Sequence, residues 1–198
     1  MSTELTDRFT SAVALALDLH RGQKRKLSGT PFAAHLLRVA GIVLEHGADE
    51  ETAIAAVLHD AIEDQGGPKA REIICERFGE RVAGIVEECS DTDETPKPPW
   101  RQRKEKYLAH LASASPPAQM ISAADKLDNV RSLLASYGQS GEAVWEHFRG
   151  GREGTLWYYR SVCDILRRVG PKSLVEELSC AVAEFERAVG EGRMSKSR

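Results

Sequence analysis

The sequence has 198 residues and a mass of 21.8 kDa, which is enough for one compact domain with a buried core. Its 41% hydrophobic and 29% charged residues are typical of a soluble globular chain. The net charge of −3 gives no general attraction to nucleic acid or to an anionic membrane. No apolar run approaches a membrane span, and the polar start MSTELTDRFT is unlike a signal peptide. We therefore expect a cytoplasmic protein with neither a nucleic-acid nor a membrane partner.

The four cysteines are widely spaced and include no CxxC pair: Cys75, Cys89, Cys163 and Cys180. Each falls in a helical pattern, where a buried reduced thiol is the usual explanation. The cysteine pattern therefore favours a reducing compartment and gives no sign of a structural zinc site.

Helical periodicity recurs along the whole chain, and β-branched residues never cluster in strand-like alternation. The predicted helical segments cover residues 5–20, 31–46, 50–65, 68–78, 80–90, 100–112, 116–138, 143–148, 155–169 and 172–189. The segment GGREG, residues 150–154, is expected to be a flexible loop, and residues 191–198 a disordered tail. With no repeat and no convincing boundary, residues 1–190 are predicted to form a single all-α domain.

Ionisable residues interrupt an otherwise apolar run in Ala53–Gln65, AIAAVLHDAIEDQ: His59, Asp60, Glu63 and Asp64. On one continuous helix, at roughly 100° per residue, these four side chains fit within an arc of roughly 140°. Burying such charges without partners costs several kcal/mol each, and a divalent cation is the simplest compensating group. Chance also produces His-Asp pairs, and acidic residues at helix ends often face water. Further ligands elsewhere in the chain would have to decide between these interpretations.

A cluster of basic residues lies in RGQKRKLSG, residues 21–29, which we call the basic loop: Arg21, Lys24, Arg25 and Lys26. Such a cluster usually forms a solvated surface. Beside a metal site, however, these side chains would be well placed to hold phosphate groups, Arg as a bidentate fork and Lys as a point charge.

Lone histidines flank the basic loop. His20 ends the first predicted helix, where a favourable interaction with the helix dipole is the simpler explanation. His35 lies one turn into the next helix, where a structural hydrogen bond is more common than metal ligation.

Polar residues also share one face of the predicted helix 116–138: Asp125, Asp128, Asn129 and Ser132. An apolar face opposes them, and this pattern by itself is typical of an ordinary amphipathic surface helix.

A polar, proline-rich segment, Asp91–Pro99, is a candidate lid. The charged helix that follows carries four cations that face either water or an anionic ligand: Arg101, Arg103, Lys104 and Lys106.

Three motifs occur in the order RGQKRKLSGTPFAAH, LHDAIED and ADKLDNVRSL. Together they resemble the hydrolase domain of RelA/SpoT homologues, in particular the small stand-alone alarmone hydrolases. These belong to the HD-domain metal-dependent phosphohydrolases, and the resemblance covers residues 15–134. It implies an all-α HD-domain bundle of roughly eight to ten helices. It also implies hydrolysis of the 3′-pyrophosphate of (p)ppGpp to GDP or GTP.

The resemblance implies the following ligands for one divalent ion, usually manganese in this family: His35, His59, Asp60 and Asp125. Nitrogen and carboxylate ligands with open positions suit manganese. Glu63 and Asp64 match the acidic pair of the family, which implies that they orient or deprotonate the attacking water.

By the same resemblance, Arg25 and Lys26 match the basic pair that contacts the substrate. Asn129 and Arg131 match the polar residues after the fourth ligand, although only Asn129 shares the face of Asp125 on an ideal helix.

The chain departs from the family at Phe32, where Tyr is usual, and at Leu36, where Pro is usual. Its segment VWEHFRGGREGTLWYYR is closer to other bacterial HD-domain relatives. Alternative substrates are therefore ppApp, NADPH or a nucleoside monophosphate, and an alternative class is a non-catalytic nucleotide sensor. The 198 residues leave no room for a synthetase domain, so we expect the protein to degrade its small-molecule nucleotide. The oligomeric state is not predicted.

Overall fold

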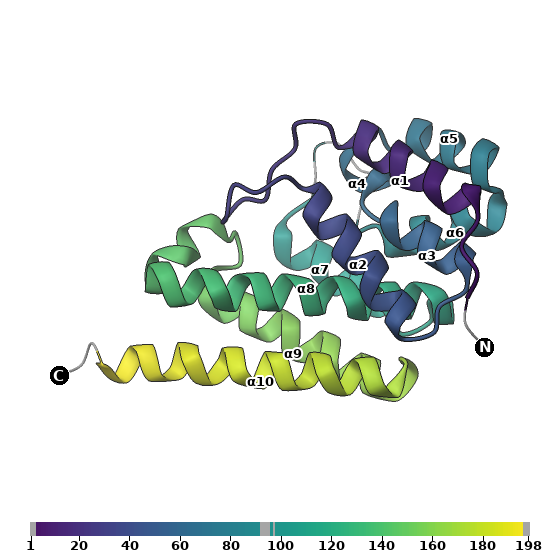
Figure 1. Cartoon of the computed structure of the whole chain (residues 1–198). Coiled ribbons are helices and arrows are strands. Elements are labelled where there is room, and N and C mark those ends of the chain that lie inside the picture. Colours follow the sequence, from purple (N-terminus) through teal and green to yellow (C-terminus); the bar gives the residue numbers. More distant parts are fainter. Residues whose placement is uncertain (1–2, 92–95, 97, 196–198) are drawn as a thin grey trace.

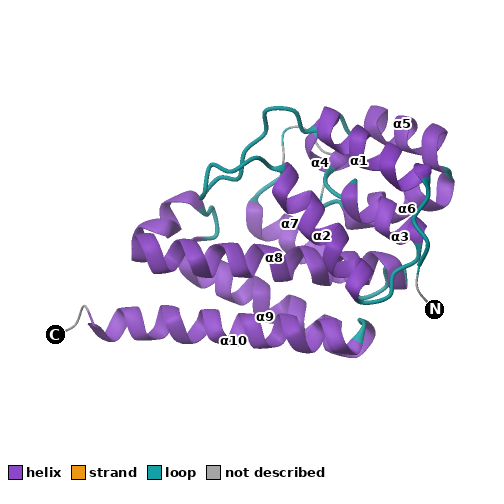
Figure 2. Cartoon of the chain, in the orientation of Figure 1, coloured by secondary structure: helices purple, strands orange, loops and turns teal. Residues whose placement is uncertain are grey.

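The protein is described here by a computed structural model that covers residues 3–91, 96 and 98–195. Within this part of the chain there are ten α-helices and one 3₁₀ helix, and no strand (Figures 1 and 2). The elements are α1 Asp7–Leu19, α2 Ala33–Glu45, α3 Glu50–Val57, α4 Ala61–Asp64, α5 Pro68–Phe78, α6 Glu80–Cys89, α7 Trp100–Leu111, α8 Pro116–Ser140, η1 Gly141–His147, α9 Gly151–Val169 and α10 Lys172–Ser195. The predicted all-α fold is confirmed.

Several helix boundaries follow local chemistry. Asp49 caps α3 by accepting a hydrogen bond of 2.8 Å from the Thr52 N–H. Ser115 caps α8 in the same way, and Pro116 supplies the preset φ of a first helical turn. Gly79, at φ +90°, makes the sharp turn between α5 and α6.

The long helix α8 forms the centre of the domain. It packs against α2 and α6 on the side of the N-terminal helices, and against α9 and α10 on the other (Figure 1). These neighbours bury Leu127 and Val130, and they also bury Asp125 and Asp128. The prediction of an amphipathic surface helix is therefore wrong for α8. Because other helices cover its polar face, these carboxylates lie inside the domain.

The segment Ala53–Gln65 is not one helix as predicted. Helix α3 ends at Val57 and α4 begins at Ala61, with a turn between them. The ring of His59 contacts the carbonyl oxygen of Ala56 at 2.8 Å, and in a continuous helix the Asp60 N–H would occupy that oxygen. His59 and Asp60 therefore project from the turn, and Glu63 and Asp64 project from the short helix α4.

The glycine-rich segment 150–154 belongs largely to α9, so the prediction of a flexible loop is wrong. The Trp100 ring packs directly on its backbone: a Cβ atom at Gly150 would lie 2.6 Å from the ring and one at Gly154 would lie 3.0 Å away. The glycines thus permit close packing between α7 and α9.

Two further predictions concern the end of the last helix and the candidate lid. Helix α10 continues to Ser195, beyond the predicted end at residue 189, because neither Gly190 nor Gly192 stops it. Residues 196–198 of the predicted tail lie outside the described residues. The same holds for residues 92–95 and 97 of the candidate lid.

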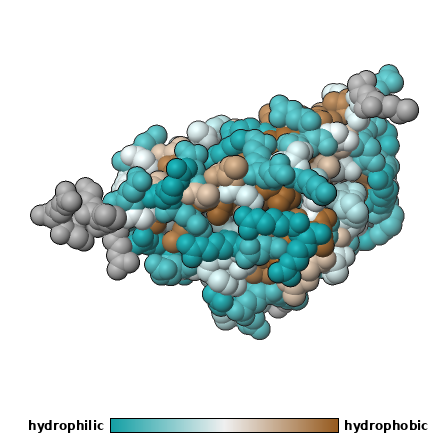
Figure 3. All heavy atoms as spheres, turned by 90° about the horizontal axis from the view of Figure 1, so that it is seen from below, coloured by the Kyte–Doolittle hydropathy of each residue, from teal (hydrophilic) through white to brown (hydrophobic). Residues whose placement is uncertain are grey.

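No helix in the described part of the chain is both long and apolar enough to cross a membrane. Polar residues cover much of the face drawn in Figure 3, with smaller apolar areas between them. All four cysteines are free; Cys163 is buried as predicted, whereas Cys180 is exposed.

Candidate metal centre

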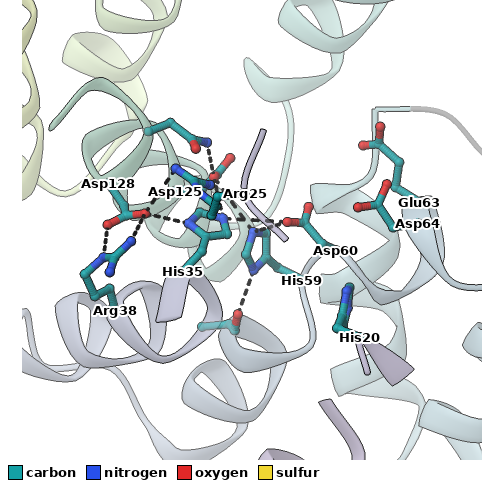
Figure 4. A network of polar contacts seen from close by, with 12 residues as sticks. His20, Arg25, His35, Arg38, His59, Asp60, Glu63, Asp64, Asp125 and Asp128 are labelled. Carbon is teal, nitrogen blue, oxygen red and sulfur yellow. Dashed lines mark hydrogen bonds and ion pairs between the residues drawn. The ribbon is translucent and has the colours of Figure 1, made fainter. Parts of the chain in front are cut away.

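Three parts of the fold meet at a buried polar cluster (Figure 4). His35 comes from the first turn of α2, His59 and Asp60 from the turn between α3 and α4, and Asp125 from the middle of α8. One potential ligand atom each of His35, His59 and Asp125 lies within 4.8 Å of the other two. These three residues are 1%, 2% and 7% exposed. We call His35, His59, Asp60 and Asp125 the metal cluster.

The ring nitrogens and carboxylates of the metal cluster face one another. The Nε2 atom of His35 lies 3.2 Å from Asp125 Oδ1, and that of His59 lies 3.8 Å from the same oxygen. Asp60 Oδ2 lies 3.1 Å from His59 Nε2 and 3.6 Å from His35 Nε2. The structure thus brings the four predicted ligands together, with Asp60 slightly more open than the others.

Hydrogen bonds behind the rings set which nitrogen faces the cluster. The Nδ1–H of His59 donates to the Ala56 carbonyl at 2.8 Å, so its Nε2 is the nitrogen that faces the cluster. That Nε2 is buried and has no hydrogen-bond partner among the described residues. Buried polar atoms rarely remain unpaired in folded proteins. An unpaired imidazole nitrogen beside two carboxylates fits a divalent metal ion.

Carboxylates dominate the electrostatics of the metal cluster. Burial disfavours the charged form of His35, but Asp125, Asp128 and Asp60 outweigh it and raise its pKa from 6.5 to about 10. Burial likewise opposes ionisation of Asp125, yet Lys126 and the two histidines hold the pKa of that carboxyl well below its usual range. The cluster therefore attracts positive charge, which protons supply when no metal ion is bound.

Asp128 is a residue of the site to which the sequence analysis assigned no role. It is 4% exposed, and its Oδ2 accepts a 2.6 Å hydrogen bond from the Nδ1–H of His35. Arg38 and Arg25 approach the same carboxylate. One feature of the sequence could have identified Asp128: it follows Asp125 by three residues, a spacing that places both carboxylates on one face of α8.

Two neighbours on α8 contact Asp125 directly. Lys126 pairs with Asp125 Oδ2, and the side-chain amide of Asn129 donates to Asp125 Oδ1. Arg131 has a different environment, since its exposed guanidinium pairs with Glu177 of α10. The structure therefore places Asn129 at the metal cluster and Arg131 on a separate ion pair.

The predicted catalytic pair lies on α4, beyond Asp60 in the view of Figure 4. Glu63 Oε2 accepts the backbone N–H of Asp91 at 3.2 Å, and its Oε1 lies 3.8 Å from Arg103 Nη1. Asp64 is exposed, and its Oδ2 accepts a 2.9 Å hydrogen bond from the Gln23 side chain. We call Glu63 and Asp64, together with Arg25 and Lys26, the polar rim.

Buried polar groups support this rim from two sides. Arg103, one of the cations predicted to face water or a ligand, is instead 9% exposed and also pairs with Asp91. His20 is 4% exposed and does more than cap α1: its Nδ1 lies 2.8 Å from Gln23 Oε1. The His20 ring also stacks on Phe32, with centroids 5.2 Å apart.

The basic loop lies next to the metal cluster through Arg25. Its Nη2 is 3.6 Å from Asp128 Oδ2, and its side chain is 13% exposed, whereas Lys26 is exposed. The Arg25 N–H donates to the carbonyl of Thr30, just after the loop, and the Arg25 carbonyl accepts the Gly29 N–H, at 2.9 Å each.

A cavity of about 250 Å³ adjoins the end of the loop, between it, α8 and η1. Its lining mixes apolar side chains with polar ones, which include Ser28, Ser132, Ser136, Gln139 and His147.

Comparisons with known proteins agree with this architecture. The family model described as HD domain matches residues 12–156. The protein named guanosine-3′,5′-bis(diphosphate) 3′-pyrophosphohydrolase MESH1 of Xenopus tropicalis is 36% identical, over 72% of this chain and 79% of its own length. The bifunctional (p)ppGpp synthase/hydrolase SpoT of Escherichia coli is 35% identical over 64% of this chain, which spans only 18% of SpoT.

A solved structure described as "A metazoan ortholog of SpoT hydrolyzes ppGpp and plays a role in starvation responses" superposes with a TM-score of 0.76. Its sequence is 28% identical, and the match covers 94% of this chain and 99% of that one. The similarity therefore extends over almost the whole helical domain.

Proposed function

Because this chain belongs to the HD-domain family, we propose that it is a metal-dependent phosphohydrolase that removes pyrophosphate from the 3′ position of (p)ppGpp, giving GDP or GTP. The observation that carries this proposal is the buried, unpaired Nε2 of His59 beside His35 and two carboxylates. The activity in the name of the Xenopus relative, most of whose length this chain covers, supports the substrate.

In this proposal, the metal cluster binds one divalent ion through the following residues: His35, His59, Asp60 and Asp125. Two imidazole nitrogens and two carboxylates suit Mn²⁺ as the resident ion. When bound, such an ion acts as a Lewis acid that polarises a phosphate oxygen and makes water more acidic. The hydrogen bonds on His59 and His35 keep both rings oriented with Nε2 toward the ion.

Glu63 and Asp64 act as the general base in the proposed reaction. Water attacks the 3′-diphosphate, and a carboxylate of this pair accepts the proton as the P–O bond forms. The P–O bond to the ribose 3′-oxygen then breaks, this oxygen takes up the proton that the carboxylate accepted and leaves as a hydroxyl, and pyrophosphate is released. The Asp91 N–H holds Glu63, and Gln23 holds Asp64, so both carboxylates are oriented while they remain accessible from the rim.

Arg25, Lys26 and Asn129 bind the substrate in this proposal. A substrate with clustered phosphates suits two cations at the edge of the metal cluster. The lining of the cavity includes Ser28, two residues after the basic pair, and Ser132, one turn of α8 beyond Asn129. We assign the nucleoside to this cavity. The substrate contact predicted for Arg131 stays a prediction; its guanidinium pairs with Glu177 in this structure.

We further propose that the protein acts in the cytoplasm on a small nucleotide, without a nucleic-acid or membrane partner. The net charge of −3 supports the absence of a polyanionic partner.

The test is incubation of the purified chain with ppGpp, with and without Mn²⁺, followed by ion-exchange separation of the products. We expect GDP and pyrophosphate only when the metal is present, and neither with the His59→Ala variant. Intact ppGpp in the presence of bound metal would contradict the proposed substrate and direct the assay to ppApp, NADPH and nucleoside monophosphates. Binding of these nucleotides without turnover of any would favour a sensor.

A further inference from the structure

The buried carboxylate of Asp128 joins the metal cluster to two guanidinium groups. Its Oδ2 accepts the His35 Nδ1–H at 2.6 Å and a hydrogen bond from Arg38 Nη2 at 3.3 Å. Its Oδ1 accepts from Arg38 Nε, and Arg25 Nη2 lies 3.6 Å from Oδ2. Every group that surrounds this carboxylate in these contacts is therefore a donor or a cation.

From this arrangement we propose that Asp128 is a positioning residue that fixes His35 in the tautomer and orientation needed to ligate a metal ion. The inference rests on the proposed metal site and adds a residue behind it. An ionised carboxylate can only accept hydrogen bonds, so the nitrogen of His35 that faces Asp128 must carry the proton. The other nitrogen, Nε2, is then left to face Asp125 and Asp60.

The two arginines explain why an amide could not replace this carboxylate. A side-chain amide has one oxygen and one NH₂ group. Arg38 and Arg25 would attract the oxygen of an asparagine at this position, and the NH₂ group would then turn toward His35. An NH₂ donor requires a bare Nδ1, which moves the ring proton to Nε2 and blocks ligation. The change from Asp to Asn thus preserves shape and reverses the polarity seen by the histidine.

A purely structural role is the competing explanation, because the contacts of Asp128 also tie α8 to α2. Arg38→Ala separates the two explanations. It removes the two hydrogen bonds that Arg38 donates to Asp128, from a side chain that is 50% exposed, and leaves His35 and its carboxylate partner in place. If Asp128 acts only by joining the helices, the loss of Arg38 should impair metal binding as much as the loss of the carboxylate.

The experiment is calorimetric titration of MnCl₂ into the wild-type chain, Asp128→Asn and Arg38→Ala, with thermal unfolding as a check on folding. We expect Asp128→Asn to raise the Kd for Mn²⁺ by about 10- to 100-fold, the usual effect of losing a residue that orients a ligand. We expect Arg38→Ala to stay within about threefold of wild type, since a half-exposed ion pair contributes little.

Equal Mn²⁺ affinity of Asp128→Asn and wild type would overturn the inference, as would an equally large loss in Arg38→Ala. Failure of the wild-type chain to bind any divalent ion would instead overturn the proposed function, so the two failures are distinct.

A second measurement on the wild-type chain does not depend on any variant folding. With Zn²⁺ as a diamagnetic ion, long-range ¹H–¹⁵N spectra should show His35 protonated at Nδ1 and metal-bound at Nε2. A spectrum with Nδ1 unprotonated would overturn the role of Asp128.

Discussion

His35, His59 and Asp125 are at most 7% exposed, whereas Asp64 and Lys26 of the polar rim are exposed to solvent. In the metal cluster, the Ala56 carbonyl and the Asp128 carboxylate fix the rings from behind. At the rim, the bond to Asp64 comes from a side chain of the loop before α2. A ligand set must be preorganised before the ion arrives, but the groups that meet a substrate must stay accessible. Changes in the two regions should therefore have different consequences.

The largest expected effect is on metal binding in His59→Ala. This change removes the unpaired nitrogen of the cluster, and we expect no measurable Mn²⁺ binding by calorimetry. His46→Ala is the matched control, because His46 contacts Ser173 and Glu177 of α10. Mn²⁺ affinity that survives in His59→Ala but is lost in His46→Ala would refute the assignment of the cluster.

Glu63→Ala should impair catalysis at the rim without weakening metal binding at the cluster. We expect Mn²⁺ affinity close to wild type and a turnover of ppGpp that is lower by about 10²-fold or more, the scale expected when acid–base catalysis is lost. Glu186→Ala, which removes the partner of Arg160 on the outer helices, is the matched control. An unchanged rate in Glu63→Ala would show that its assigned role is wrong.

The pH dependence of Mn²⁺ affinity tests the cluster alone. Because the pKa of His35 is raised from 6.5 to about 10, metal binding near neutral pH must displace its proton. The Kd should therefore fall by up to about tenfold for each pH unit between about pH 6 and 8. Titration in two buffers with different ionisation enthalpies would count the released protons. A Kd independent of pH would contradict the raised pKa.

The raised pKa also affects the metal-free fold, with a defined sign. A folded-state pKa above the unfolded value stabilises the protein fully below pH 6.5, and this contribution disappears as the pH rises through about 10. Saturating Mn²⁺ should remove this part of the pH dependence in thermal unfolding.

The smallest effect is expected for Gln23→Ala. This change removes the hydrogen bond to Asp64 and the contacts of Gln23 with His20 and Gln65, but no group that contacts the metal or the phosphates. We expect kcat to fall by roughly two- to tenfold, the scale of one hydrogen bond, with Mn²⁺ affinity unchanged. Weaker Mn²⁺ binding in this variant would show that the rim and the cluster are not independent.

Residues close together in the sequence could be predicted with few errors. The His59-Asp60 pair and the Glu63-Asp64 pair stood out because charges interrupt an apolar run, and they do lie at adjoining parts of the site. The predicted single helix through them was wrong. A side-chain bond to the Ala56 carbonyl breaks it, and helical periodicity contains no information about such a bond.

Site residues that lie far apart in the sequence were harder to predict. Neither His35 nor Asp125 looked like a ligand from its own helix, and only the resemblance to a family suggested that role. Asp128 was placed on a polar face but without a partner, because its partners lie on α2 and in the basic loop. Arg103 looked like a surface cation, yet Asp91 and Glu63 surround it inside the fold.

The all-α class, most helix positions and the local charge pairs can be derived from the sequence, because these depend on spacing along one helix and on capping residues. The packed fold was needed to show which polar faces are buried, that α8 is the central helix, and that Asp128 lies behind His35. The physical reason is that periodicity shows the direction of a side chain about its own helix axis. Its burial and its hydrogen-bond partners depend on which other helices pack against that face.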